Sequence, residues 1–212
     1  MNTDGLNEIA DSIRKHLDAK HRAREQALAL CREVIRLSAN AIRAVHRQEF
    51  PAAEELLAKA RRNLDETSAR LTEHQDIFHA GFVHDAHKEF AEAHTTLALI
   101  AGRPLPAPEE LGVMGASYLN GLGETVGELR RHLLDSLRAG DIPHCEESLA
   151  AMGDIYDVLV TMDYPEAVTS GLRRTADAMR GILERTRGDF TMAYAQRHLE
   201  DRLRELEERL RG

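Results

Sequence analysis

Two pairs of glutamates in the middle of the chain have the residue type and spacing of a metal site. Glu89 and Glu92 are three residues apart, and Glu124 and Glu128 are four apart. On a helix both spacings make the two side chains neighbours, with Cβ atoms roughly 5–6 Å apart. Like charges at this distance repel mildly, and a cation would remove the repulsion. Carboxylate oxygens suit Mg²⁺ or Mn²⁺, whereas two solvated acidic helix faces are the simpler interpretation.

Each glutamate pair needs a helix with an apolar face that holds it against the rest of the protein. The first pair lies in a helix predicted over residues 82–101, whose apolar face consists of Phe82, Ala86, Phe90, Ala93 and Leu97. The second lies in a helix predicted over residues 115–139, with an apolar face of Leu119, Leu122, Val126, Leu129 and Leu133. Packing these two helices together would bring four carboxylates to one point. Interior glycines cost about 1 kcal/mol each relative to alanine, so close packing is expected at Gly121, Gly123 and Gly127.

Arginines form a stripe along an earlier helix, predicted over residues 3–49. The stripe spans only about 60° around the helix axis and consists of Arg32, Arg36, Arg43 and Arg47. An uninterrupted stripe of this kind suits the phosphates of a nucleic-acid strand. A solvated face, with Glu33 and its neighbours as partners, explains the stripe equally well.

The composition is that of an all-α protein with an aliphatic core. The chain has 212 residues, 42% of them hydrophobic, but only 4% aromatic and no tryptophan. No segment alternates between apolar and polar residues with a period of two, so no strands are expected. We expect one domain, spanning residues 1–212, with seven helices over residues 3–49, 51–80, 82–101, 115–139, 143–161, 165–187 and 189–210. The proline-rich stretch 103–108 is expected to be a loop within that domain.

Several classes of protein are disfavoured by the sequence. The formal net charge of −8 argues against broad adhesion to nucleic acid, although not against a local basic site. Two cysteines give neither a zinc pattern nor a disulfide framework. A polar, acidic N-terminal stretch and the lack of a run of about 20 apolar residues predict a cytoplasmic protein that does not associate with membranes. No Glu-x-x-His occurs, which opposes a ferritin-like di-iron site, and His84 with His87 is only a weak metal motif.

A series of short motifs follows in an order and spacing that resembles one known family. These motifs are Arg32-Glu33-Val34-Ile35 with His46-Arg47, Glu89-Phe90-Ala91-Glu92-Ala93, Tyr118-Leu119 with Gly127-Glu128-Leu129, Gly140-Asp141-Ile142, Tyr156-Asp157 and Arg187-Gly188. The family is translin/Trax, and the resemblance, which covers most of the chain, is to its Trax-like, catalytic branch. Glu89 and Glu92 match the first acidic pair of that branch, and Glu128 matches the shared glutamate of the later motif. Glu124 stands where Trax has an aspartate, so the carboxylate is kept.

The resemblance implies a seven-helix translin-like fold and assembly into closed, hollow octamers that bind single-stranded RNA or DNA inside. Trax-type subunits are Mg²⁺-dependent endoribonucleases, whereas translin-type subunits lack most of the acids and bind without cutting. We therefore expect a homo-oligomeric endoribonuclease in which Glu89, Glu92, Glu124 and Glu128 hold one or two Mg²⁺ or Mn²⁺ ions that activate a water. A nucleic-acid-binding shell without cleavage is the alternative, and a purely structural helical oligomer is the third possibility.

Overall fold

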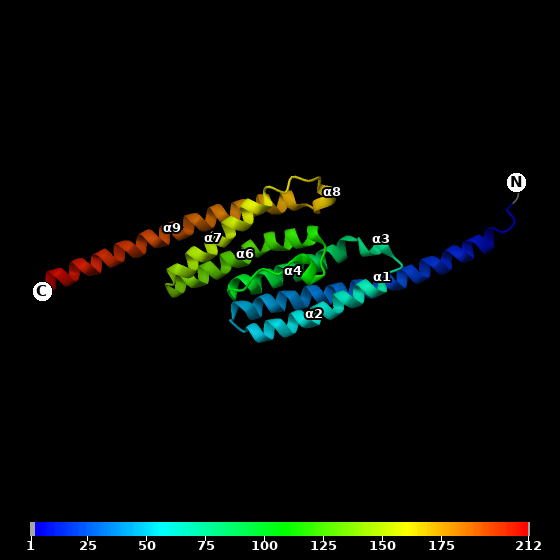
Figure 1. Ribbon diagram of the computed structural model, residues 1–212, viewed down its shortest axis with the longest axis horizontal. Helices are drawn as coiled ribbons and strands as arrows, with labels where there is room; N and C mark the ends of the chain where they lie inside the picture. Colours follow the sequence, from blue (N-terminus) through cyan, green and yellow to red (C-terminus); the bar gives the residue numbers. More distant parts are fainter. Residues whose placement is uncertain (1–2, 212) are drawn as a thin grey trace.

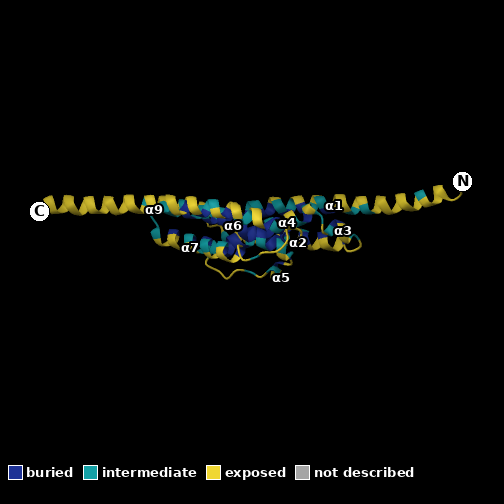
Figure 2. Ribbon diagram, turned by 90° about the horizontal axis from the view of Figure 1, so that it is seen from above, coloured by how far each residue is buried: buried dark blue, intermediate teal, exposed yellow. Residues whose placement is uncertain are grey.

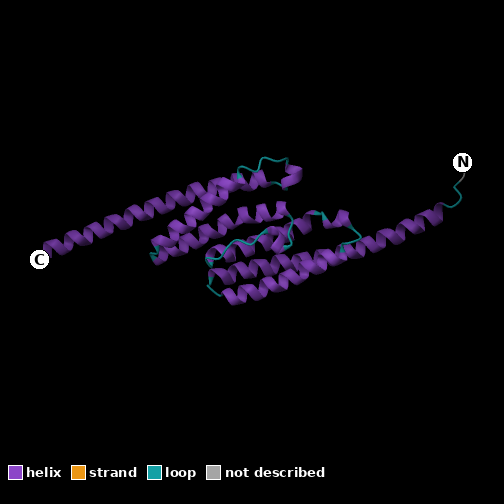
Figure 3. Cartoon of the chain, viewed as in Figure 1, coloured by secondary structure: helices purple, strands orange, loops and turns teal. Residues whose placement is uncertain are grey.

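The structure, a computed structural model, describes residues 3–211, and all regular elements in that range are α-helices (Figures 1 and 3). The long helices are α1 (Leu6–His46), α2 (Phe50–Arg70), α4 (Gly81–Ile100), α6 (Gly115–Ala139), α7 (Ile142–Leu159) and α9 (Leu172–Arg211). Three single-turn helices complete the described chain: α3 (Gln75–Phe78), α5 (Pro108–Leu111) and α8 (Glu166–Thr169). The all-α class predicted from the sequence is confirmed.

The structure corrects the expected helix boundaries at three places. The helix expected over residues 51–80 ends at Arg70, and a turn leads into α3, which lets both Leu71 and Ile77 enter the core. The division expected at residues 188–189 is wrong, because α9 continues through it; a glycine inside a helix costs only about 1 kcal/mol. Pro165 precedes only the short α8, which Ser170 and Gly171 end with φ angles of 50° and 88°. The last two expected helices are therefore one.

The long helices pack side by side, and the buried core lies where they overlap (Figures 1 and 2). Helix α1 packs on α2 and α4, α4 packs on α6, and α6 packs on α7 and α9. The core is aliphatic apart from a few rings; among its fully buried side chains are Val34, Leu57, Phe90, Val126 and Leu133. Burial of each such side chain stabilises the fold by roughly 1.5–3 kcal/mol. Helix α6 thus has α4 on one side and α7 and α9 on the other.

Glycines let α6 approach its neighbours closely, as the sequence predicted. A Cβ atom on Gly121 would lie 2.5 Å from the backbone oxygen of Lys88 and 2.9 Å from the backbone nitrogen of Glu92, both on α4. A Cβ on Gly123 would collide with Thr175 of α9. Gly127, in contrast, has no atom within 4 Å of its ideal Cβ position. Close packing therefore explains the first two interior glycines but not the third.

The N-terminal end of α1 and the C-terminal end of α9 extend past the bundle in opposite directions and are exposed (Figure 2). Each extension carries a stripe of apolar side chains that are 52% to 86% exposed: Leu6, Ile9, Ile13 and Leu17 on α1, and Leu199, Leu203, Leu206 and Leu210 on α9. Within residues 3–211, no helix is both long enough and apolar enough to cross a bilayer.

Candidate metal centre

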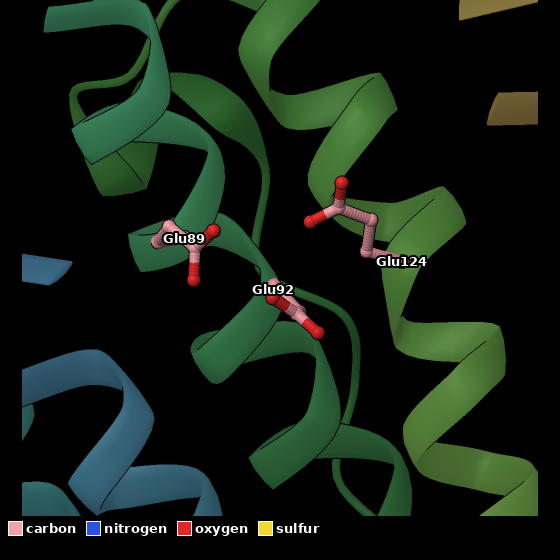
Figure 4. A group of neighbouring side chains, drawn as sticks. All are labelled: Glu89, Glu92 and Glu124. Atoms are coloured by element: carbon pink, nitrogen blue, oxygen red, sulfur yellow. The ribbon is translucent and has the colours of Figure 1, made fainter. Parts of the chain in front are cut away.

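Three of the four predicted glutamates come together where α4 faces α6. Helix α4 supplies Glu89 and Glu92, and α6 supplies Glu124 (Figure 4). One carboxylate oxygen from each lies within 4.8 Å of the other two. Oxygen ligands of an octahedral Mg²⁺ ion are at most roughly 4.2 Å apart, because each lies about 2.1 Å from the metal. A small rotation of the side chains would therefore let one ion contact all three. A set of three carboxylates also has the hard-donor chemistry that Mg²⁺ and Mn²⁺ prefer.

Burial makes Glu92 the most perturbed member of this acidic triad, defined as Glu89, Glu92 and Glu124. The residue is only 9% exposed. Burial raises the pKa of the Glu92 carboxyl to about 8, and the neighbouring carboxylates of Glu89, Glu124 and Glu128 act in the same direction. Burial also raises the pKa of Glu89. Three ionised carboxylates are thus disfavoured at this point unless a cation accompanies them.

A lysine that the sequence analysis overlooked contacts the acidic triad. The Nζ atom of Lys88 lies 2.8 Å from Oε1 of Glu124 and 3.4 Å from Oε1 of Glu89. Although burial lowers the pKa of Lys88, the Glu124 and Glu89 carboxylates outweigh burial and raise that pKa. Spacing along the helix did not predict the contact between Lys88 and Glu89, because consecutive helical residues do not face each other. Lys88 reaches the triad by extending across the interface from α4 to α6.

Glu128 lies beside the acidic triad but is held by a different partner. Its Oε2 atom is 2.5 Å from Nε2 of His46, which belongs to α1 and has a side chain only 3% exposed. This hydrogen bond lowers the pKa of Glu128. The structure therefore brings three of the predicted carboxylates together and fixes the fourth on a histidine. His46 was part of a family motif, but its spacing within α1 did not predict this contact.

The predicted arginine stripe lies on the exposed face of α1 and ends at Arg47, the residue that directly follows the helix. Arg32, Arg36, Arg43 and Arg47 are all exposed. Local partners are present, as the solvated-face interpretation predicted: Arg36 pairs with Glu33, and Arg47 pairs with Glu49. Ion pairs at exposed positions contribute at most about 1 kcal/mol. These arginines can therefore exchange their partners for another anion at little cost.

An open groove runs beside the acidic triad between α4, α6 and the beginning of α9. One part of the groove is lined by Lys88 and Glu124 together with His84, Ser170 and Arg174. An adjoining part is lined by Glu92, Glu124 and Arg174, with apolar contributions from α9. The triad is thus accessible from outside, at a surface that also carries basic side chains.

The weak histidine motif does not contribute to the metal centre. His87 is buried, burial lowers its pKa to about 4, and its Nδ1 atom accepts a hydrogen bond from the backbone nitrogen of Met114. His84 makes a 3.3 Å contact with the hydroxyl of Ser117. Over the range 3–211, the acidic triad is the one cluster of His, Cys, Asp and Glu side chains with metal-binding spacing.

Comparisons with known proteins place the chain beside a small group of solved structures. No protein-family model matches it. AfC3PO in complex with duplex RNA is 34% identical, with a TM-score of 0.82 over 89% of this chain and 97% of that one. A crystal structure of AfC3PO gives 33% identity and a TM-score of 0.81 over 89% and 98% of the two chains. Apo-NeC3PO, at 19% identity, has a TM-score of 0.73 over 91% and 99%, and so shares the fold.

A curated relative is also similar along most of its length. It is an uncharacterized protein, MJ0175, from Methanocaldococcus jannaschii, and it is 29% identical over 197 residues. The match covers 91% of this chain and 86% of that protein.

Proposed function

Because the chain belongs to the translin/C3PO family, as its motifs predicted, we propose that it is a Mg²⁺-dependent endoribonuclease that cleaves RNA within an oligomeric shell. The observation that carries this proposal is the convergence of Glu89, Glu92 and Glu124 from two helices on one accessible point. The solved complex of AfC3PO with duplex RNA supports RNA as the class of ligand. Single-stranded RNA remains the preferred substrate in our proposal, on the strength of the motif resemblance.

The residues around the acidic triad have distinct roles in this proposal. Glu89, Glu92 and Glu124 would hold the metal ion, and Glu92, whose pKa is raised to about 8, would have to give up its proton to serve as a ligand. When bound, Mg²⁺ supplies an activated water and neutralises charge that develops on the scissile phosphate. Glu128, which His46 orients, would be available to accept a hydrogen bond from a water beside the triad.

Basic side chains lead the RNA to the metal centre. The arginine stripe on α1 binds backbone phosphates, which makes the binding independent of base sequence and applies to single-stranded DNA as well as RNA. His46 is the last residue of α1, directly before Arg47, and contacts Glu128 on α6. The same helix therefore carries the phosphate-binding face and one support of the metal centre.

Self-association is the role that we assign to the exposed ends of α1 and α9. Their leucine and isoleucine stripes repeat at three- and four-residue spacing, and contiguous exposed apolar surface of this kind is typical of an interaction site. Copies of the chain bury these stripes against one another in a closed homo-oligomer, with eight subunits expected from the family resemblance. Native mass measurement of the particle tests this assembly, and a stable monomer at micromolar concentration contradicts it.

A non-cutting, nucleic-acid-binding shell is the second candidate. It is favoured by Lys88, whose ammonium group already neutralises part of the acidic triad. End-labelled oligonucleotides distinguish the two: single-stranded RNA, its duplex and the equivalent DNA are each incubated with Mg²⁺, with Mn²⁺ and with EDTA. Our proposal expects metal-dependent cleavage of RNA. Tight binding of every strand without cleavage under any metal condition would favour the second candidate.

A further inference from the structure

Lys88 places a positive charge where the acidic triad requires a cation. Its ammonium group contacts two of the three triad carboxylates, at 2.8 Å from Glu124 and 3.4 Å from Glu89. Opposite charges in contact at a half-buried position attract each other more strongly than they do in water. A metal ion that binds the same oxygens must therefore displace the ammonium group or bind against its repulsion.

The ammonium group can leave the triad without unfolding any element. Lys88 and its partner Glu124 both line the open groove, together with Asp85 and Arg174, and the Lys88 side chain is 24% exposed. A lysine side chain has several rotatable bonds between its helix and its charge. The ammonium group can therefore rotate along the groove away from Glu124, and an anion bound elsewhere in the groove would attract it.

Lysine, rather than arginine, at position 88 is consistent with a positive charge that can move. Only four of the 28 lysine and arginine residues of the chain are lysines. Arginine would hold a carboxylate through a rigid, two-pronged pair, whereas lysine is a compact point charge on a flexible stem. Most basic residues of the chain are arginines, but the one at the triad is a lysine, which releases a carboxylate more easily than an arginine does.

We propose that Lys88 is a built-in counterion that competes with the metal ion for Glu124 and Glu89 until an RNA phosphate in the groove draws it away. The inference rests on the proposed metal-dependent function. Its consequence is cooperative binding, because any ligand that moves Lys88 into the groove strengthens metal binding, and the metal strengthens RNA binding by the same factor. The protein then binds metal poorly in the absence of RNA.

Calorimetric titration with Mn²⁺ tests this competition without any measurement of cleavage. Lys88→Gln removes the competing charge and should bind Mn²⁺ at least about tenfold more tightly than wild type, which corresponds to about 1.4 kcal/mol. Lys88→Met, which also keeps an unbranched apolar stem, should behave in the same way. Lys59→Gln is the matched control, since it removes the same charge from an exposed position on α2 and should leave the Mn²⁺ affinity within about twofold.

Repeating the titration with a 2′-O-methyl RNA oligonucleotide, which resists cleavage, tests the coupling. The oligonucleotide should raise the Mn²⁺ affinity of wild type about tenfold more than it raises the affinity of Lys88→Gln, because any direct contact between metal and phosphate is common to both proteins. Equal Mn²⁺ affinities of wild type and both folded Lys88 variants would overturn the inference. A wild-type Mn²⁺ affinity that is the same with and without the oligonucleotide would also overturn it. The double variant Glu89→Gln/Glu124→Gln separates the two claims. If it loses Mn²⁺ binding while both Lys88 variants bind Mn²⁺ as wild type does, the inference about Lys88 fails and the metal centre stands; if it binds Mn²⁺ as wild type does, the metal centre itself fails.

Discussion

The Nε2 atom of His46 lies 2.5 Å from Oε2 of Glu128, which joins α1 directly to the helix that carries half of the predicted carboxylates. The histidine is almost fully buried at this contact. It precedes Arg47, the last residue of the arginine stripe. If α1 shifts when RNA binds, the His46 hydrogen bond would therefore move the Glu128 carboxylate with it.

Replacing His46 tests whether that bond supports activity. His46→Ala should lower RNA cleavage by about 10- to 100-fold, the usual effect of removing a residue that orients a group at a metal site. His46→Gln, whose amide can still donate a hydrogen bond, should recover part of the loss. Because the His46 hydrogen bond lowers the pKa of Glu128, the acidic limb of the pH–rate profile should also move to higher pH in His46→Ala. An unshifted profile would leave His46 with a packing role alone, and His144→Ala, at an exposed histidine, serves as the control.

Two glycines of α6 give opposite predictions for the same substitution. Gly121→Ala places a methyl group against the backbone of α4, so it should destabilise the protein by about 1–3 kcal/mol and separate Glu124 from Glu92. Gly127→Ala meets no atom within 4 Å and should stabilise α6 by up to about 1 kcal/mol. Thermal unfolding of both variants measures the difference. Equal melting temperatures would show that α4 and α6 do not depend on their close approach.

The raised pKa of Glu92 predicts a stability that depends on pH. Its pKa of about 8 in the folded protein lies above the ordinary carboxyl value of 4.5, so the folded state holds the proton more tightly than the unfolded state does. Folding therefore carries no penalty from this group below pH 4.5, and the penalty grows as the pH rises from 4.5 to 8. In EDTA, the free energy of unfolding of Glu92→Gln should exceed that of wild type by an amount that grows across this window to roughly 4 kcal/mol. The difference in melting temperature should grow in the same way. A melting difference that stays constant from pH 5 to pH 8 would contradict the assignment.

The arginine stripe predicts how binding responds to salt. Replacing Arg32 and Arg43 with glutamine should weaken the binding of single-stranded RNA of any sequence. It should also flatten the plot of log affinity against log salt by about 1.4, since each phosphate contact on a single strand contributes a slope of roughly 0.7. Fluorescence anisotropy with a labelled oligonucleotide at several salt concentrations measures both effects. If neither affinity nor slope changes, the stripe is a solvated face.

Spacing along the chain was sufficient to predict the residues on each helix, but not how the helices face one another. The predicted apolar faces of residues 82–101 and 115–139 are buried, except that Phe82 and Leu119 are only partly so, and Glu89, Glu92 and Glu124 meet where the two helices face each other. The contacts of Lys88 with Glu124 and of His46 with Glu128 join residues 36 and 82 positions apart. Such contacts depend on the rotation and approach of neighbouring helices, which periodicity within one helix does not determine.

The same limit explains two of the corrected boundaries. Glycine at position 188 was expected to end a helix, but its cost is small and α9 continues past it. The end of α2 at Arg70 was not predicted, because the turn that follows is stabilised by burial of Leu71 and Ile77 among residues distant in the sequence. Local propensity is a weak signal wherever tertiary burial opposes it.

Single-turnover cleavage of an end-labelled single-stranded RNA, measured with RNA binding on the same samples, tests the metal centre most directly. In Mg²⁺, Glu92→Gln and Glu124→Gln should cut at least about 10²- to 10³-fold more slowly than wild type while their RNA affinity stays within about threefold. Glu124→Asp, which keeps the carboxylate, should retain activity, and EDTA should stop the wild-type protein until Mg²⁺ or Mn²⁺ is restored. Wild-type cleavage in excess EDTA, or unchanged cleavage by the double variant Glu92→Gln/Glu124→Gln, would contradict the account.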